Sequence, residues 1–161
     1  MTDPTLTRIL SFLADIGLPA EQRELPPPTV LPGISVERGV LLVDPPRVTW
    51  PGDLLHEAGH LAVLPREQRL ELSANVGDDG GNEMGAIAWS YAAAQALGLP
   101  IEVVFHDCGY KGGAAAVRAA FADGRYFGVP ILEWRGLTDY QQPGAAQRAT
   151  RYPRMKKWLC D

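Results

Sequence analysis

The sequence predicts an α+β fold in which a small antiparallel β-sheet packs against a core of helices. Three features favour this class. Residues 5–17 place apolar side chains at helical spacing, and residues 34–43 form two short β-branched runs around a glycine. Two apolar stretches, 51–64 and 82–97, end at Pro or Gly as buried helices do. With 161 residues, 46% of them hydrophobic, the chain can bury one core, so we expect residues 1–161 to form a single domain.

The N-terminal part of the chain predicts one helix and one hairpin. Apolar residues recur every three or four positions in residues 5–17, and Gly17 ends the run. A Pro-rich connector at 25–32 follows, which should be stiff and extended. The runs 34–37 and 40–43, with a glycine in the turn between them, predict a β-hairpin.

The central part predicts two helices. We expect Thr49-Trp50-Pro51 to open the first, with Thr49 as its N-cap and Pro51 acceptable in the first turn, and the helix to stop before Pro65. The second should begin near Asn82 or Glu83 and run to about residue 97, where a glycine and a nearby proline end it. These two helices form the predicted helical core.

The C-terminal part has shorter elements. Residues 101–105 are β-branched and aromatic and predict a strand, and 128–134 is another possible strand. The Ala-rich residues 112–122 predict a helix. The basic segment 145–161 predicts a helix or a pair of turns. Its cations favour a solvated helix face, with a docking surface for an acidic partner as the alternative.

Composition excludes several classes of protein. The net charge is −4, whereas a nucleic-acid-binding protein normally has a basic surplus. No apolar run reaches membrane-spanning length, and the N-terminus lacks the basic and apolar regions of a signal peptide. We therefore expect a cytoplasmic protein that binds neither nucleic acid nor membranes. Cys108 and Cys160 form no CxxC pair and should be ordinary thiols.

The central helix carries the motif His56-Glu57-Ala58-Gly59-His60, which matches HExxH. Residues four apart stack on one face of a helix, so both imidazoles can reach one ion. Zinc accepts such nitrogen ligands and keeps one position open in catalytic sites. Glu57 points to the side of the pair, where it can reach a zinc-bound water without ligating the metal.

The neighbours of this motif favour a metal over an accidental spacing of two histidines. The helix is apolar on nearly every side, which is typical of a buried helix. Three ionisable side chains in such a helix would each cost about 1–3 kcal/mol if unsatisfied, and a metal with its water would satisfy all three. Gly59 costs about 1 kcal/mol relative to Ala in a helix, which indicates tight packing at this position.

A third protein ligand is needed, and Glu83 is the preferred candidate. It lies near the start of the second predicted helix, with 22 residues between it and His60, a gap that suits a helix–loop–helix return. An acid in a first helical turn is also favoured by the helix dipole alone. The alternatives are His106, Asp78, Asp79 and Cys108.

The motif in its context, Leu54 to Ala62, resembles the active-site helix of the zincin metallopeptidases. Glu83, within Asn82-Glu83-Met84-Gly85-Ala86, is similar to the third ligand of the gluzincin branch, and the third histidine of metzincins is missing after His60. The small size and the preceding hairpin resemble the minimal, cytoplasmic ImmA/IrrE-type peptidase domains over residues 33–97. This resemblance implies a short antiparallel sheet beside two zinc-bearing helices.

The functional expectation is a zinc-dependent metallopeptidase-like hydrolase acting on a peptide or protein substrate. His56, His60 and Glu83 would hold Zn²⁺, and Glu57 would activate the zinc-bound water. The developing oxyanion would be stabilised by the metal and by His106, Tyr91 or Tyr110. His106 has an equally good interpretation as a structural histidine. The alternative function is a catalytically silent zinc-binding regulatory or interaction protein, with the basic segment or residues 134–140 covering the metal; the oligomeric state stays open.

Overall fold

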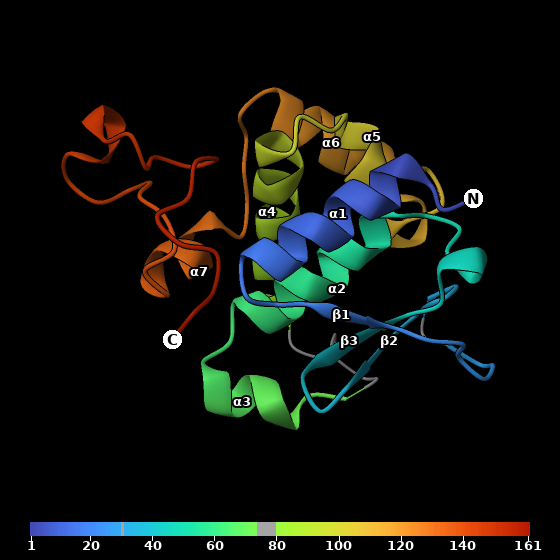
Figure 1. Cartoon of the computed structure of the whole chain (residues 1–161). Helices are drawn as coiled ribbons and strands as arrows, with labels where there is room; N and C mark the ends of the chain where they lie inside the picture. Colours follow the sequence, from blue (N-terminus) through green and yellow to red (C-terminus); the bar gives the residue numbers. More distant parts are fainter. Residues whose placement is uncertain (30, 74–79) are drawn as a thin grey trace.

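The computed structural model describes residues 1–29, 31–73 and 80–161. Helix α1 (Pro4–Asp15) begins where the carboxylate of Asp3 accepts hydrogen bonds from the backbone N–H groups of Thr5 and Leu6. Its apolar stripe is buried in the core, and Figure 1 shows α1 lying beside α2. The predicted helix over residues 5–17 is therefore confirmed, with Asp15 as its last residue.

The sheet has three strands, one more than the hairpin accounts for. Strands β2 (Ile34–Glu37) and β3 (Val40–Val43) pair antiparallel, with Val36 opposite Leu41, and so confirm the predicted hairpin. Strand β1 (Ala20–Gln22) pairs with β3 in parallel, which gives the order β1-β3-β2. The predicted α+β class is confirmed, but the sheet is mixed rather than purely antiparallel.

The two long central helices form the core and pack closely. Helix α2 (Gly52–Ala62) and helix α4 (Gly80–Ala96) meet at Gly59, where a Cβ would lie 2.8 Å from the carbonyl oxygen of Ala86. This close approach confirms the tight packing expected at Gly59. The predicted cap was wrong: Pro51 precedes α2 and no side chain caps the helix, so Thr49 has no such role.

Two segments expected to be strands are short helices. Residues Ile101–Val104 form α5, which follows the extended Pro100, and Val129–Trp134 form α7. Gly128, with a φ of 78°, precedes α7, and a proline occupies its first turn. A proline preset for a first helical turn thus outweighs the β-branched composition of α7. The Ala-rich helix is confirmed as α6 (Ala114–Ala122).

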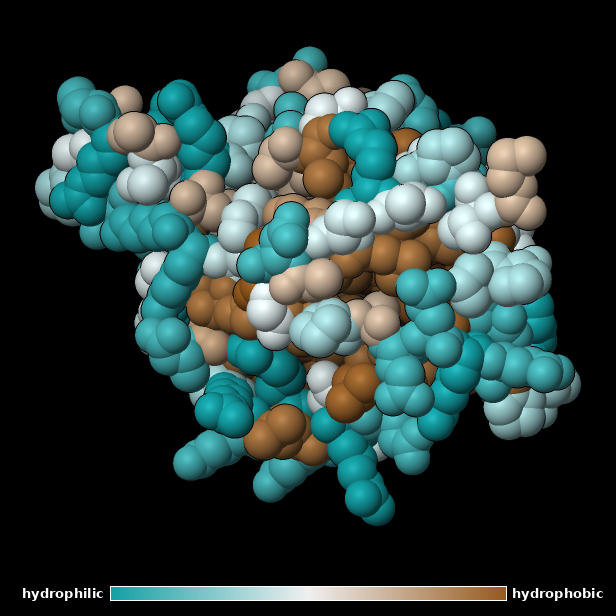
Figure 2. Space-filling model, viewed as in Figure 1, coloured by the Kyte–Doolittle hydropathy of each residue, from teal (hydrophilic) through white to brown (hydrophobic). Residues whose placement is uncertain are grey.

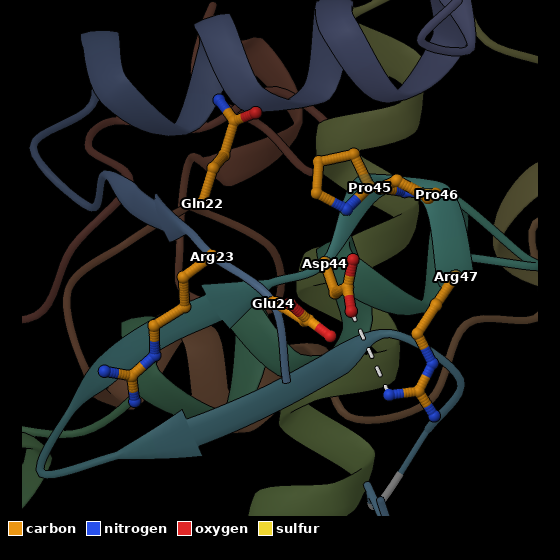
Figure 3. A pocket seen from close by; sticks show the side chains of 7 residues that line it. All are labelled: Gln22, Arg23, Glu24, Asp44, Pro45, Pro46 and Arg47. Atoms are coloured by element: carbon orange, nitrogen blue, oxygen red, sulfur yellow. Dashed lines mark ion pairs between the residues drawn. The ribbon is translucent and has the colours of Figure 1, made fainter. Parts of the chain in front are cut away.

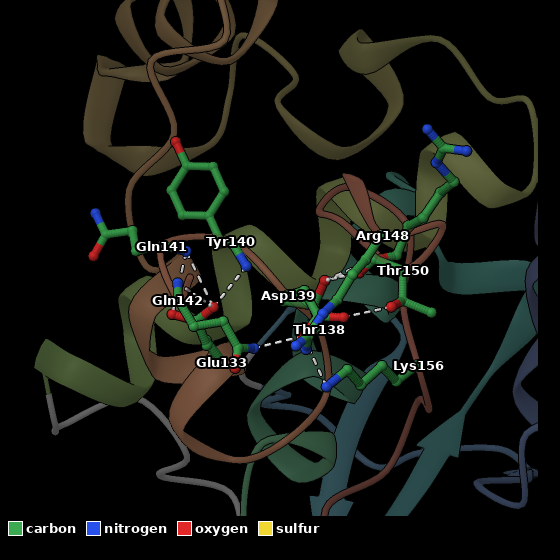
Figure 4. Close-up of polar contacts among 10 residues, drawn as sticks. Glu133, Thr138, Asp139, Tyr140, Gln141, Gln142, Arg148, Thr150 and Lys156 are labelled. Atoms are coloured by element: carbon green, nitrogen blue, oxygen red, sulfur yellow. Dashed lines mark hydrogen bonds and ion pairs between the residues drawn. The ribbon is translucent and has the colours of Figure 1, made fainter. Parts of the chain in front are cut away.

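The basic C-terminal segment folds as turns around a buried acid. Asp139 is fully buried, and its Oδ1 lies 2.8 Å from both Arg148 Nη1 and Lys156 Nζ (Figure 4). Burial opposes ionisation of Asp139, but hydrogen bonds from Lys156, Thr150 and Arg148 outweigh it and lower its pKa to about 2. Two cations of the segment, Arg148 and Lys156, therefore form intramolecular ion pairs with Asp139, and the segment is not a solvated helix.

The end of the chain packs against the last turn of α2. The guanidinium of Arg69, in α3 (Arg66–Glu71), donates to the carbonyl oxygens of Leu61, Leu64 and Cys160 at 2.9, 3.1 and 2.6 Å. The Cys160 N–H donates to Ala62 O. These bonds satisfy carbonyl groups that a helix end leaves without partners.

The remaining short helices are the 3-10 turns η1 (Pro45–Arg47), η2 (Tyr110–Gly112) and η3 (Ala145–Gln147).

The surface of the chain is mostly polar on the face of Figure 2, with apolar side chains near its middle, in the region of α1 and α2. The protruding C-terminal part, on the left of the same view, is largely polar. Among the described helices, none combines the length and the apolar character needed to cross a membrane.

Candidate metal centre

Helix α2 places His56 and His60 one turn apart, and their rings meet edge to face with Nε2 atoms 3.1 Å apart. Helix α4 brings Glu83 to the same point. Its carboxylate oxygens lie 3.2 Å from His56 Nε2 and 3.0 Å from His60 Nε2. The close packing of α2 on α4 at Gly59 and Ala86 allows these side chains to meet.

The separations of these atoms suit one small ion. Ligand atoms at about 2.0–2.1 Å from a tetrahedral zinc are about 3.3 Å from one another. The observed separations of 3.0–3.2 Å are close to this value. Glu57 lies nearby as well, and the potential ligand atoms of His56, Glu57 and His60 all fall within 4.8 Å of one another. The described residues thus contain a His/Glu/His group that can hold a metal ion.

The two glutamates of this group have opposite electrostatic environments. Glu57 is only 6% exposed, and burial raises its pKa to about 7, with the negative charges of Glu83 and Asp53 adding to the rise and His60 opposing it. Hydrogen bonds from His56 and His60 hold the pKa of Glu83 well below its usual range. Glu83 is therefore ionised at neutral pH, whereas Glu57 is poised between its acid and base forms.

The two imidazoles are held in different ways. The His60 side chain is 2% exposed, and its Nδ1 has no hydrogen-bond partner in the described part of the chain. The His56 side chain is 14% exposed, and its Nδ1 lies 3.3 Å from the hydroxyl oxygen of Tyr110. Packing therefore fixes the ring of His60, and a hydrogen bond with Tyr110 contributes to fixing the ring of His56.

A cavity of about 490 Å³ opens onto this group. Its apolar lining comes from Leu31, Pro32 and Trp50, and the segment from Cys108 to Lys111 lines it as well. No described residue after Lys111 lines the cavity, so neither the basic segment nor residues 134–140 cover the metal group. The remaining lining residues are Asp53, His56, Glu57, Glu83 and His106.

His106 lines this cavity and contacts Asp53, a pairing that the sequence did not suggest. Its Nε2 lies 2.7 Å from Asp53 Oδ1, and its ring stacks on Trp50 with centroids 4.6 Å apart. Its Nδ1 is buried without a partner among the described residues. Asp53 lies three positions before His56, so helical spacing could have identified it as part of the same face.

The fold places the other candidate residues in different environments. Tyr91 does not line the cavity, because its ring packs in the aromatic core against Phe105 and Phe121. Cys108 is exposed on the cavity wall. Asp78 and Asp79 lie outside the described residues. Of the two candidate tyrosines, the structure brings only Tyr110 to the metal group.

A second cavity, of about 530 Å³, lies beside the end of β3 and has no such chemistry (Figure 3). Among its charged side chains, Asp44 pairs with Arg47 at 3.9 Å, and Arg23 pairs with Glu37 at 2.9 Å. No potential metal-binding group of the described residues lies there. Among the described residues, the potential metal-binding group is therefore the His/Glu/His group of the first cavity.

The identity of the site rests on this geometry alone. Comparison of the chain with protein-family models, with curated proteins and with solved structures finds no match.

Proposed function

We propose that this protein is a zinc-dependent metallopeptidase-like hydrolase. His56, His60 and Glu83 would hold the ion, and Glu57 would act as the general base. The observation that carries the proposal is the convergence of two imidazole Nε2 atoms and one carboxylate at 3.0–3.2 Å beside an open cavity. Two nitrogens and one oxygen from protein, with space left on one side, are the ligand set of many catalytic zinc sites.

A zinc ion bound there would supply a Lewis acid and lower the pKa of water. The chain supplies the proton transfers. Glu57, with a pKa of about 7, can take a proton from the attacking water and pass it to the leaving amine. Glu83 is better suited to holding the ion than to this transfer, since its lowered pKa keeps it ionised.

His106 would contact the substrate from the wall of the cavity. Asp53 holds its Nε2, as a carboxylate orients a catalytic imidazole in other hydrolases. The unpartnered Nδ1 is a buried polar atom that costs about 1–3 kcal/mol. Because the Nε2–H donates to Asp53, the Nδ1 of the neutral ring is an acceptor, and a hydrogen bond from a substrate N–H would offset this cost.

An extended peptide would bind along β2. Among the described residues, strand β3 has neighbours on both sides, whereas β2 lies at an edge of the sheet, where a further strand can pair with its backbone. Leu31 and Pro32, just before β2, already line the cavity. A peptide paired with β2 could therefore continue into the metal centre.

Cleavage of a mixed peptide library, with new termini identified by mass spectrometry, tests the proposal. Wild type should generate new termini that disappear with a chelator and return with zinc, and Glu57→Gln should generate none. The general-base step contributes about 10²–10⁴-fold in rate, so the loss in this variant should be easy to detect. Zinc binding without any cleavage would instead favour the non-catalytic alternative, a zinc-dependent regulatory or interaction protein.

A further inference from the structure

Tyr110 lines the cavity and contacts the metal group at His56. Its hydroxyl oxygen lies 3.3 Å from His56 Nδ1, and the two rings are nearly perpendicular, with centroids 5.7 Å apart. The other ring nitrogen of His56, Nε2, points at His60 and Glu83. The two nitrogens of one imidazole are thus divided between a phenol and the metal group.

This division matters because a neutral imidazole carries a single N–H. To bind an ion through Nε2, His56 must carry its proton on Nδ1, and that proton needs an acceptor. The Tyr110 hydroxyl oxygen is in place to accept it. The opposite arrangement, with Nδ1 accepting from the phenol, would put the proton on Nε2 and block the ion.

The backbone shows that Tyr110 is held there against its local preference. Tyr110 and Lys111 have φ values of 55° and 52°, in the left-handed region that residues with a side chain rarely adopt. Gly112 follows with a φ of 86°. Such backbone persists where surrounding contacts impose it, and it is frequent at functional sites. Here the ring of Tyr110 is fixed edge-on against the fully buried Phe105 on one side and His56 on the other.

His60 has no equivalent partner. Its Nδ1 is without a hydrogen bond in the described ranges, and its orientation depends on burial. His56 lies at the cavity wall and is more exposed, so packing constrains its ring less. Of the two imidazoles of the metal group, only His56 has a hydrogen-bond partner on Nδ1 among the described residues.

We infer that Tyr110 is a positioning residue: when His56 binds a metal ion through Nε2, the Tyr110 hydroxyl accepts the Nδ1–H and so holds the ring in the orientation that presents Nε2 to the ion. The inference rests on the proposed function, because it assigns the hydroxyl a role in metal binding. It differs from a contact with the substrate: Tyr110 acts through His56 and need not touch the reacting bond.

Zinc affinity measured by competition with a chromogenic chelator tests the inference. Tyr110→Phe keeps the ring and removes only the hydroxyl, and we expect a loss of about 10–100-fold in zinc affinity. The matched control is Tyr91→Phe, another buried phenol, which does not line the cavity; its zinc affinity should stay at the wild-type value. The thermal midpoint of metal-free Tyr110→Phe should also stay unchanged, which a merely structural role would not allow.

Nuclear magnetic resonance gives a second test that needs no variant. In the zinc-loaded wild type, the Nδ1–H of His56 should show a nuclear Overhauser contact with the ring protons of Tyr110. Wild-type zinc affinity in Tyr110→Phe, or absence of this contact, would overturn the inference while leaving the proposed function intact. Failure of the wild type to bind zinc would overturn the proposed function, and the inference with it.

Discussion

Gly52 packs so closely against Val103 that a Cβ on residue 52 would overlap the carbonyl oxygen of Val103. This contact joins the first residue of α2 to α5, and His106 follows α5 by two residues. Asp53, next to Gly52, then meets His106 at 2.7 Å. Gly52, which lies outside the HExxH motif, therefore contributes to the position of His106 in the wall of the cavity.

Gly52→Ala should destabilise the protein by about 3 kcal/mol, because the new methyl group must displace backbone rather than a flexible side chain. Denaturant unfolding followed by circular dichroism would measure this change. Gly80→Ala is the matched control: a Cβ at Gly80, also in the first turn of a helix, meets no atom within 4 Å. Equal stabilities of the two variants would contradict the predicted backbone clash.

Glu83→Gln should weaken zinc binding far more than Glu57→Gln does. Replacing a charged ligand should cost more than about 100-fold in affinity, the upper range for residues that only support a ligand. Glu57→Gln should remain within a few-fold of wild type, since Glu57 is assigned to proton transfer. Isothermal titration calorimetry would measure both affinities. The reverse order would exchange the roles of the two glutamates.

The metal-free protein should show a pH dependence that comes from Glu57. Its pKa rises from 4.5 to about 7 on folding, so its neutral form stabilises the fold below pH 4.5. That contribution is lost as the pH rises through about 7. Relative to Glu57→Gln, wild type should therefore lose about 3 kcal/mol of stability between pH 4.5 and 8. Urea unfolding of both proteins in a chelator tests this, and a constant difference across that range would rule it out.

Arg69→Ala should detach the end of the chain from α2. The variant removes the donor to three carbonyl oxygens, at a cost of about 2 kcal/mol. Hydrogen exchange should show faster exchange of the Cys160 N–H, which donates to Ala62. Arg66→Ala, an exposed position on the same helix, is the control and should leave that exchange rate unchanged. Protection of Cys160 in both variants would mean that Arg69 is dispensable.

The long elements could be predicted because their signals are local. The apolar stripe of α1, the hairpin of β2 and β3, and the buried α2 and α4 each follow from periodicity and from the residues that end them. Strand β1 has three residues and two exposed polar side chains, so its pairing with β3 depends on tertiary contact alone. A run as short as α5 fits a strand and a buried helical turn equally well, and the packing of α5 on Gly52 decides between them.

The site was predictable to the extent that it lies on one helix. His56, Glu57 and His60 follow from their spacing, which places them on neighbouring positions of α2. Glu83 could be nominated from the length of the gap, and the structure places its carboxylate 3.2 and 3.0 Å from the two imidazoles; its role as a ligand stays a prediction. The Tyr110 contact could not be anticipated, because it requires two successive left-handed residues in a segment whose composition does not specify them.

The contact between Gly59 and Ala86 has a consequence for metal selectivity. Backbone meets backbone there, so side-chain rearrangement cannot widen the gap between α2 and α4 to admit a larger ion. Calcium, which requires six to eight oxygen ligands at about 2.3–2.6 Å, should be excluded by both size and ligand type. Cobalt, nickel and copper share the small radius and the preference for imidazole, and copper binds such sites more tightly than zinc. The metal supply of the cell, rather than the distance between α2 and α4, would then determine which of these small ions the protein binds.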